Sequence, residues 1–435
     1  MRNMDTGRVY LGNWLYGTFN WGGTGDVEIK EGCVGIADAV FDGQKLEHVT
    51  LPSTLLYIGA CAFRGTKIKT IDIPNSVTTI SAGAFQTGNL STINVGNSVY
   101  KIGEDAFSGT LWLENQPNGV VYVGSVAYTY KYDYREIKKE ELTLKGGCLG
   151  IADNFFYGPI ESVTIPATVK YIGSFGWFYN DMSSIVVEDG NSVYDSREKC
   201  NAVIETSSNT LILGCKNTTI PDGITIIGRC AMQNCELTSI TIPQSVKVIK
   251  ERAFENTALK SITIPRSVLK MEQGVFDRNK ELETISVDEG NIVYDSRDYC
   301  NAIVETPTNT LFAGCKTTFI PSSVVAVDNL SCEEMQDLYC YAENVPIATI
   351  LFPSSTILHV PSGSMEVYKA TTPWKNFKEI VPIGNENSID IATDKQQIPV
   401  IWYDLNGIRL NNRPIQKGIY IIKTSIGLSR MVVVN

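Results

Sequence analysis

Hydrophobic residues recur along this chain with a period of 22 positions, most clearly in the stretch 259–276, LKSITIPRSVLKMEQGVF. The stretch that begins 22 residues earlier has the same apolar positions, with Leu237 matching Leu259 and Phe254 matching Phe276. Four further units keep this spacing in two columns of residues, which are Ile36, Ile58, Ile80 and Ile102, and Phe41, Phe63, Phe85 and Phe107. Units that present the same apolar pattern can stack in register, so the chain is predicted to be a repeat array.

Every unit contains a short alternating piece of the form x-I-x-I, which predicts a strand with its two β-branched side chains turned inward. The inward pairs are Val49/Leu51, Ile71/Ile73, Ile93/Val95, Val163/Ile165 and Ile185/Val187. We expect one parallel ladder to run through Ile71, Ile93, Ile240 and Ile262. The segment I-G-x-x-A-F that follows each strand is too short for a stable helix, and it predicts a helical turn on the opposite side of the unit.

A period of about 20–29 residues that carries L-x-x-I-x-I is typical of a leucine-rich-repeat solenoid, in which each repeat is one coil stacked on the next. The predicted fold is therefore a β-rich solenoid of the α/β type with 22-residue coils. Because each coil contacts only its neighbours, such an array can extend through most of the 435 residues.

Two kinds of insertion interrupt the coils. Residues 7–16, GRVYLGNWLY, resemble residues 119–128, GVVYVGSVAY, and both are predicted to form hairpins. A longer block at 185–221 recurs 100 residues later at 285–321 with most of its positions unchanged. Inside the first copy, strand-like runs flank a turn at 207–209, which predicts a β-hairpin extension of one coil.

The repeat phrase changes near the end of the chain. Residues 345–383 are predicted to cap the solenoid, because Trp374 and Phe377 are large enough to cover an open core end. The solenoid with its cap is thus expected to occupy residues 1–383.

The charge balance limits the possible partners. The chain has 37 basic and 47 acidic residues and a net charge of −10, without a basic run, which argues against a nucleic-acid partner. Its longest apolar runs are far shorter than the roughly 20 residues that cross a bilayer, so no transmembrane segment is predicted. No cofactor is expected.

Eleven cysteines are an odd number, so at least one thiol has no partner within the chain. Cys33 occupies a repeat position that is apolar in other coils. The repeated pairs Cys200/Cys215 and Cys300/Cys315 indicate either a clip across each hairpin or buried thiols. We favour buried thiols, because free cysteine is among the most buried residue types, and we expect no metal site, because the spacings lack the close pairs of a zinc site.

Candidate catalytic residues are few. Only His48 and His359 have side chains that ordinarily titrate near neutral pH, and both fall at outward strand positions. The chain contains no H-E-x-x-H, phosphate-loop or G-x-S-x-G motif. We therefore predict a binding or adhesion protein that is not an enzyme, with a structural surface component and a secreted enzyme as the alternatives.

The phrase L-x-x-I-x-I-P-x-S-V-x-x-I-x-x-x-A-F, the block NSVYDSREKCNAVIET and the cap VPSGSMEVYKATTPWKNF together resemble the BspA-like leucine-rich-repeat family of bacterial surface proteins. The resemblance covers about residues 7–383. It implies a solenoid that is extracellular or on the cell surface and that functions in adhesion. The partner it implies is an extracellular protein or glycan, such as a host matrix protein.

The tail, with YDLNGIRL and GIYIIK, is similar to C-terminal modules by which many Gram-negative anaerobes export or display proteins, including type IX sorting domains. It is predicted to be a small β-module over 400–435, joined by a polar linker at 384–399. At the other end, the first residues lack the apolar core of a signal peptide, and no coil precedes the hairpin at 7–16. We expect the native gene to extend upstream with a signal peptide, or the sequence to be a trimmed chain.

The residues that flank the inward pairs on the strands form the candidate binding surface. Most are Ser or Thr: His48, Thr50, Thr70, Asp72, Thr92, Asn94, Ser162, Thr164, Ser239, Thr241, Ser261 and Thr263. One interpretation is that threonine simply suits an exposed strand. The other is that the stacked coils form a wide, weakly charged surface whose hydroxyls bind an extended protein or glycan. The hairpin insertions at 193–215 and 293–315 are the next candidates.

Overall fold

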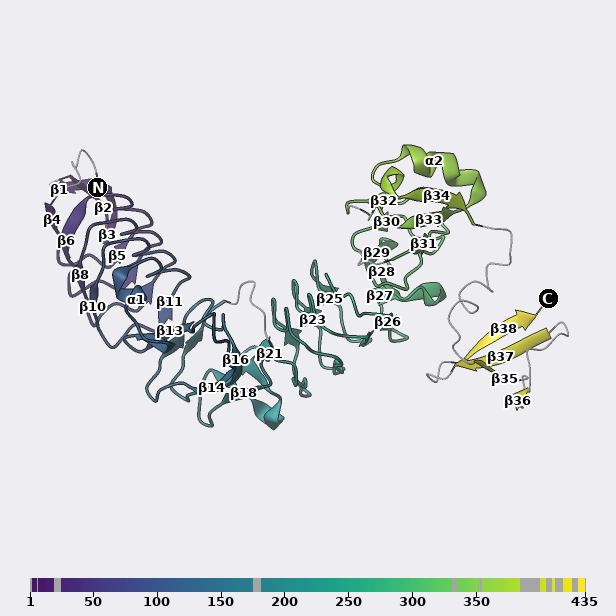
Figure 1. The fold of residues 1–435 in the computed structure, drawn as a ribbon, viewed down its shortest axis with the longest axis horizontal. Helices are drawn as coiled ribbons and strands as arrows, with labels where there is room; N and C mark the ends of the chain where they lie inside the picture. Colours follow the sequence, from purple (N-terminus) through teal and green to yellow (C-terminus); the bar gives the residue numbers. More distant parts are fainter. Residues whose placement is uncertain are drawn as a thin grey trace. The chain divides into compact units, whose positions relative to one another are not determined.

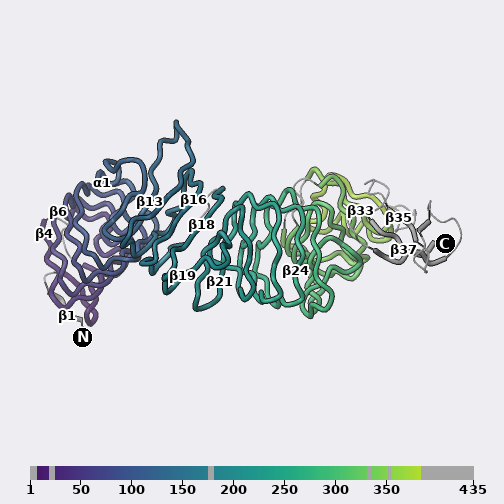
Figure 2. Tube along the Cα trace, turned by 90° about the horizontal axis from the view of Figure 1, so that it is seen from below, coloured from purple at the N-terminus to yellow at the C-terminus, as the bar shows by residue number. Residues whose placement is uncertain are grey.

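The computed structural model describes residues 2–5, 7–18, 25–174, 181–330, 335–350, 352, 354–383, 400–403, 409–410, 418–424 and 429–434. The chain divides into two compact units, Met1–Val381 and Pro382–Asn435. The first unit is a solenoid whose coils follow one another in sequence order (Figures 1 and 2). The second unit is a small antiparallel β-sheet.

Each coil of the solenoid can contribute one strand to each of two opposite sides, which we call the long-strand side and the short-strand side. The long-strand side consists of β4 (Gly25–Glu28), β6 (Leu46–Thr50), β8 (Thr70–Ile73), β10 (Thr92–Val95), β14 (Glu140–Thr143), β16 (Ile160–Ile165), β18 (Ser184–Val187), β24 (Ser261–Ile264), β26 (Thr284–Val287), β31 (Asp337–Tyr339), β33 (Ile357–Val360) and β34 (Glu379–Pro382). In β8 and β24, exposed and buried residues alternate strictly. The predicted inward orientation of the isoleucine pairs is therefore confirmed in these coils.

The long-strand side is not one continuous ladder, contrary to the prediction. It is divided into the sheets β4–β6, β8–β10, β14–β16–β18, β24–β26 and β31–β33–β34. Ile71 does pair with Ile93 across β8 and β10. Ile240, however, lies outside any strand.

A hairpin insertion precedes the coil that contains Ile240. There, Thr219 donates its backbone N–H to the carbonyl of Cys200, at the base of the hairpin, instead of to a strand of the long-strand side. Phe319 makes the same bond to Cys300 in the second copy, where Ile320 nevertheless bridges to Cys340, so this bond alone does not account for the position of Ile240.

The short-strand side is built from strands of only two residues. These are β5 (Gly35–Ile36), β7 (Tyr57–Ile58), β9 (Thr79–Ile80), β11 (Lys101–Ile102), β15 (Gly150–Ile151), β17 (Tyr171–Ile172), β22 (Ile226–Ile227), β23 (Val248–Ile249), β25 (Lys270–Met271), β30 (Ala326–Val327) and β32 (Ile347–Ala348). The predicted helical turn is wrong: β5, β7, β9, β11, β15, β22, β23 and β25 are each followed by hydrogen-bonded turns and not by a helix. A strand directs its backbone groups to the neighbouring coils, whereas a helical turn would direct them back to its own residues.

The predicted hairpin insertions are confirmed, and each of them begins a new run of the short-strand side. They are β1 (Arg2–Asp5) to β2 (Arg8–Leu11) and β3 (Trp14–Thr18); β12 (Gly119–Val123) and β13 (Val126–Lys131); β19 (Tyr194–Asp195), β20 (Ala202–Glu205) and β21 (Thr210–Gly214); and β27 (Tyr294–Asp295), β28 (Ala302–Glu305) and β29 (Thr310–Gly314). In each run the last hairpin strand pairs in parallel with the first two-residue strand of the next coil. The insertions are thus part of the solenoid wall.

In three of the insertions, a buried tyrosine completes the hydrogen bonding of the coil that precedes the insertion. Its hydroxyl accepts a hydrogen bond from a backbone N–H, and the pairs are Tyr128 with Phe107 at 2.9 Å, Tyr194 with Ile172 at 3.2 Å and Tyr294 with Met271 at 2.9 Å. Burial raises the pKa of all three phenols, so they remain neutral. The hydroxyl takes the place of the next coil's carbonyl where the regular ladder stops.

The core of the first coils is a column of stacked phenylalanines. Phe41, Phe63, Phe85 and Phe107 are buried, and their ring centroids are 5.3, 5.2 and 5.3 Å apart with planes within 12° of parallel. Stacking at this spacing follows from placing one aromatic residue at the same position of every coil.

Neighbouring coils approach so closely that some positions accept only glycine. A Cβ added to Gly59 would lie 2.5 Å from the carbonyl carbon of Ala37, and one added to Gly103 would lie 2.4 Å from the nitrogen of Ala82. Glycine at 59 and 103 therefore permits a close approach to the preceding coil, whereas Ala37, Ser81 and Lys250 hold the same position in other coils.

The end of the solenoid is covered by α2 (Met365–Ala370) and the turns around it. Trp374 is fully buried and donates from Nε1 to the carbonyl of Pro346 at 2.7 Å. Phe352 packs against Trp374 and Phe377 with ring centroids 4.6 and 4.7 Å away. These large rings pack together at the end of the last coil.

The cysteines of the hairpins are buried free thiols, as predicted. Cys200, Cys215, Cys300 and Cys315 each have less than 1% of their surface exposed. Burial raises the pKa of Cys200 to about 11 and that of Cys300 to about 12. These thiols are therefore protonated at neutral pH and poor nucleophiles.

The second unit contains four antiparallel strands in the order β36–β35–β37–β38. Their bounds are β35 (Val400–Tyr403), β36 (Arg409–Leu410), β37 (Gly418–Thr424) and β38 (Ser429–Val434). The expected linker at 384–399 and the Asn406-Gly407 turn lie outside the described residues, so both stay predictions.

Replacing Phe63 with alanine should lower the free energy of unfolding by about 3–5 kcal/mol, because the cavity would interrupt the stack between Phe41 and Phe85. Urea denaturation followed by circular dichroism would measure the loss. Leu56→Ala is the control, since Leu56 is 47% exposed. Equal effects of the two substitutions would contradict a central role for the stack.

Replacing Tyr294 with phenylalanine should destabilise the fold by about 1–3 kcal/mol, because the buried N–H of Met271 would lose its acceptor. The matched control is Tyr299→Phe on the same insertion, where the side chain is 67% exposed. Thermal melts of both variants would compare them, and an unchanged Tyr294→Phe melt would show that the hydroxyl is dispensable.

Limited proteolysis should cut first within 384–399 and release a stable fragment that contains the solenoid, since the polar segment joins two units with separate cores. Mass spectrometry of the fragments would locate the cut. First cleavage inside the solenoid would contradict the predicted linker.

Candidate binding surface

All candidate residues except Ser239 and Thr241 lie on strands of the long-strand side. His48 and Thr50 are exposed on β6. On the next two strands, Thr70 is in register with Thr92 and Asp72 with Asn94, and all four are exposed. The first coils thus present the predicted rows of outward side chains.

The candidates of the later coils are less uniform. Ser162 and Thr164 on β16 are only half-exposed. Ser261 and Thr263 on β24 are exposed, and the Thr263 hydroxyl lies 2.9 Å from the Ser286 hydroxyl of the next strand. These two hydroxyls form a cross-strand hydrogen bond, which is a stabilising pair in its own right.

Ser239 and Thr241 are exposed but do not lie on a strand. The prediction placed them on the same ladder as Ser261 and Thr263, and this is wrong, because both residues lie outside any strand. Their orientation is therefore not set by strand pairing, and they cannot extend the rows of the neighbouring coils.

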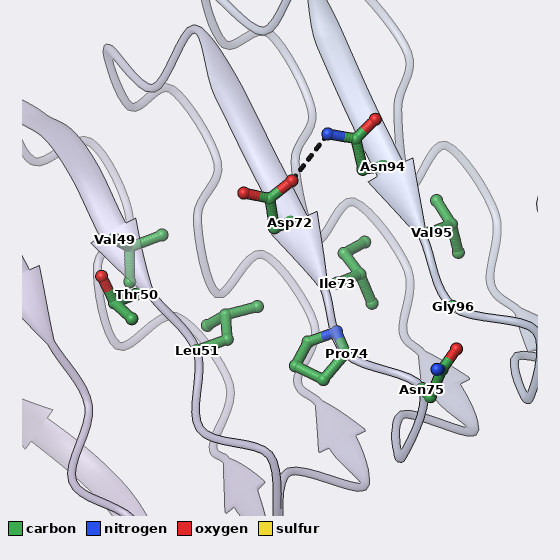
Figure 3. Close-up of a pocket in the computed structure, with 10 residues that line it drawn as sticks. All are labelled: Val49, Thr50, Leu51, Asp72, Ile73, Pro74, Asn75, Asn94, Val95 and Gly96. Atoms are coloured by element: carbon green, nitrogen blue, oxygen red, sulfur yellow. Dashed lines mark hydrogen bonds between the residues drawn. The ribbon is translucent and has the colours of Figure 1, made fainter.

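An open depression of about 440 Å³ lies where β6, β8 and β10 end (Figure 3). Ten residues line it: Val49, Thr50, Leu51, Asp72, Ile73, Pro74, Asn75, Asn94, Val95 and Gly96. Three of them, Thr50, Asp72 and Asn94, are predicted site residues. The structure thus brings together polar candidates from three successive coils in one concavity.

Asp72 and Asn94 are the polar centre of this depression. Asn94 donates from Nδ2 to Asp72 Oδ1 at 2.6 Å, and Figure 3 shows the two side chains pointing toward one another. This bond orients the carboxylate and leaves its second oxygen and the Asn94 amide oxygen as acceptors. The site can therefore accept hydrogen bonds from the N–H or O–H groups of a ligand.

Sequence reasoning missed the apolar and backbone parts of the depression. Val49 and Val95 are only partly buried and line the depression beside the polar pair. A Cβ added to Gly96 would lie 2.5 Å from the Cα of Asn75, so glycine allows this turn to approach its neighbour. The sequence does mark this turn as different from its neighbours, because Gly96 stands at the position that Pro52 and Pro74 hold in the preceding coils.

Each histidine is paired with an aspartate of the preceding coil. Nδ1 of His48 lies 2.8 Å from Asp26, and Nε2 of His359 lies 2.7 Å from Asp337. These contacts are cross-strand pairs between adjacent coils, which accounts for both histidines without a catalytic role.

The alternative site in the hairpins is organised by local ion pairs. Arg297 lies 2.6 Å from Asp295 and donates to Asn309 at 2.6 Å. Burial acts to raise the pKa of Asp295, but the hydrogen bonds from Arg297 and Thr306 outweigh it and lower the pKa. Asp195 and Arg197 repeat this geometry in the first copy. The polar groups of the turn are thus engaged with one another.

Two further features concern metal binding and the membrane. Among the described residues, no group of three His, Cys, Asp or Glu side chains is arranged to hold a metal ion. No helix in the described part of the chain has the length and apolar character needed to cross a membrane.

Several solved structures are similar in fold. A leucine-rich repeat protein from Eubacterium ventriosum is 15% identical, with 83% of this chain and 93% of that chain aligned at a TM-score of 0.38. The pneumococcal vaccine antigen PcpA is 15% identical over 88% of this chain and 99% of that chain, at a TM-score of 0.36. A leucine rich cell surface protein from Faecalibacterium prausnitzii is 18% identical over 89% and 96%, at a TM-score of 0.34. No match to a curated protein was found.

The family comparison is more direct. The family described as the BspA type leucine rich repeat region matches in six copies, over residues 16–134, 127–200 and 204–324. The matched ranges include the coils from β5 to β26 and the insertions that begin at β12, β19 and β27, and they form more than half of the chain. On this match and the stacked coils, the chain belongs to the BspA-type family of bacterial leucine-rich-repeat proteins.

Proposed function

We propose that this chain is an extracellular or cell-surface adhesion protein that binds a protein or glycan ligand through its long-strand side. The observation that carries the proposal is the depression at β6, β8 and β10, where Thr50, Asp72 and Asn94 converge from three coils. Membership of the BspA-type family supports an extracellular or cell-surface location, because resemblance to that family implies a surface solenoid.

The rigidity of the surface favours binding. Strand pairing holds Asp72 in register with Asn94, and their mutual hydrogen bond fixes the carboxylate before any ligand arrives. A preformed site avoids part of the entropy cost of ordering side chains on binding. The depression is open rather than enclosed, which suits part of an extended ligand better than a small molecule that must be surrounded.

The chemistry of the depression defines what it can recognise. Oxygens of Asp72 and Asn94 accept hydrogen bonds, and the hydroxyl of Thr50 can donate or accept. Val49 and Val95 add apolar contact at the rim. Backbone amides of a polypeptide and hydroxyls of a glycan both meet these requirements, and the family resemblance implies adhesion to either class.

The test is retention of the purified full chain on immobilised extracellular matrix proteins and glycans. The double variant Asp72→Lys/Asn94→Lys should weaken retention at least about tenfold, because two ammonium groups would replace the acceptors. Its melting temperature should change little, since both side chains are exposed.

A charge-matched control is Glu104→Lys/Asn118→Lys, which makes the same change of charge at exposed residues away from the long-strand side. Retention that is equal in both double variants would refute the depression as the site. Loss of retention in Thr241→Lys/Thr263→Lys instead would move the site along the solenoid. Self-assembly of the chain without retention of any ligand would favour a structural role.

A further inference from the structure

In the last coils of the long-strand side, some outward positions carry aromatic side chains in place of the hydroxyl side chains of the earlier coils. Phe319, Tyr339 and His359 occupy one register position in three successive coils, since Ile320 pairs with Cys340 and Tyr339 pairs with His359. All three aromatic residues are partly exposed. We call them the aromatic column.

The aromatic column is held in place by its own contacts. The His359 ring stacks on Tyr339 with centroids 4.2 Å apart and planes 13° from parallel. Nε2 of His359 lies 2.7 Å from Oδ1 of Asp337, and Phe319 meets Tyr341 edge to face at 5.6 Å. A surface with so many mutual contacts is already ordered before it meets a ligand.

The duplicated block provides an internal comparison for this surface. Its two copies share most residues, but Phe319 of the second copy stands where the first copy has Thr219. Thr219 is exposed, and the coil around it keeps the same hairpin and the same buried cysteines. The coil therefore folds without an aromatic residue at this position, and packing alone does not require one.

The charge of the long-strand side is one-sided. Its strands, all of which lie within the described residues, contain nine carboxylates and no Lys or Arg: Asp26, Glu28, Glu47, Asp72, Glu140, Glu141, Glu161, Asp337 and Glu379. Two of them, Asp337 and Glu379, belong to the sheet that carries the aromatic column, and both are exposed. The surface thus combines aromatic faces with negative charge.

Aromatic faces beside a carboxylate suit one class of ligand better than others. An arginine guanidinium can stack on an aromatic ring and pair with a carboxylate at once, and a lysine ammonium can do so less specifically. An anionic ligand would be repelled by Asp337 and Glu379. A neutral sugar could stack on the rings but would not benefit from the charge.

We propose that the aromatic column, with Asp337 and Tyr341, is a subsite for arginine or lysine side chains of an extended partner polypeptide. This inference rests on the proposed function, in which the long-strand side binds a ligand. Strands about 4.8 Å apart place the three rings over about 10 Å. That distance equals about three residues of extended polypeptide. One or two cationic side chains can therefore reach the column together.

The test uses the full chain and synthetic ten-residue peptides of alternating arginine and serine, with a glutamate-serine peptide and a neutral oligosaccharide as the other probes. The arginine peptide should bind, and Phe319→Thr and Tyr339→Ser should each weaken it at least about tenfold. Phe319→Thr reproduces the first copy, so it should remain folded. Tyr299→Ser is the control, because it removes an aromatic side chain that is 67% exposed outside the column.

A charge test is provided by Asp337→Asn, which keeps an oxygen for His359 and removes the negative charge. This variant should bind the arginine peptide more weakly and with less dependence on salt concentration, because screening acts on the lost charge. Melting temperatures of all variants would establish that they are folded.

Several results would overturn the inference. These are equal binding of the arginine and glutamate peptides, wild-type affinity in Phe319→Thr, and binding of the oligosaccharide at the column without binding of the arginine peptide. Retention on the matrix panel is measured in parallel. If Asp72→Lys/Asn94→Lys abolishes that retention while the arginine peptide fails to bind, only the cationic subsite is refuted.

Discussion

Each coil of this solenoid leaves backbone N–H and C=O groups at its edges that only a neighbouring coil can satisfy. Unpaired buried backbone groups are costly, so the coils must stack in one register along the described array. The 22-residue period supplies that register, and it also places Phe63 between Phe41 and Phe85. Gly59 and Gly103 permit the close approach that the hydrogen bonds require. Most other features of the fold depend on this constraint.

An insertion is compatible with this stacking only if it offers the next coil a strand edge with which to pair. Every hairpin ends in a strand that pairs in parallel with the next two-residue strand, so the following coils find a regular edge. On the side that the hairpin interrupts, the hydroxyls of Tyr128, Tyr194 and Tyr294 accept the hydrogen bonds that the missing carbonyls would have accepted. The long-strand side is divided into separate sheets, and an insertion lies at three of these divisions, between β10 and β14, between β18 and β24 and between β26 and β31. A surface made of short sheets can differ in chemistry from one sheet to the next.

That difference is visible between the two ends of the long-strand side. Around β8 and β10 the outward side chains are small and polar, with Asp72 and Asn94 joined at the edge of an open depression. Around β31 and β33 they are aromatic, with Asp337 bonded to His359. Strand pairing fixes the spacing of both sets, so each can bind without rearrangement. The absence of Lys and Arg from the described strands of this side gives the two regions the same sign of charge.

The repeat period, the inward isoleucine pairs, the hairpin insertions and the buried cysteines were all determined by the sequence, because each depends on residues close together in the chain or on an exact recurrence. Exposed positions such as Thr50, Asp72 and Asn94 followed from strand alternation in the same way. Only the tertiary structure decided that Ile240, Ser239 and Thr241 lie outside a strand, since strand pairing depends on hydrogen bonds between coils, whereas the local pattern of this segment matches that of Ser261–Ile264. It also decided that Val95 and Gly96 complete a depression and that Phe319, Tyr339 and His359 align, because those groupings depend on register between coils whose lengths vary around the insertions.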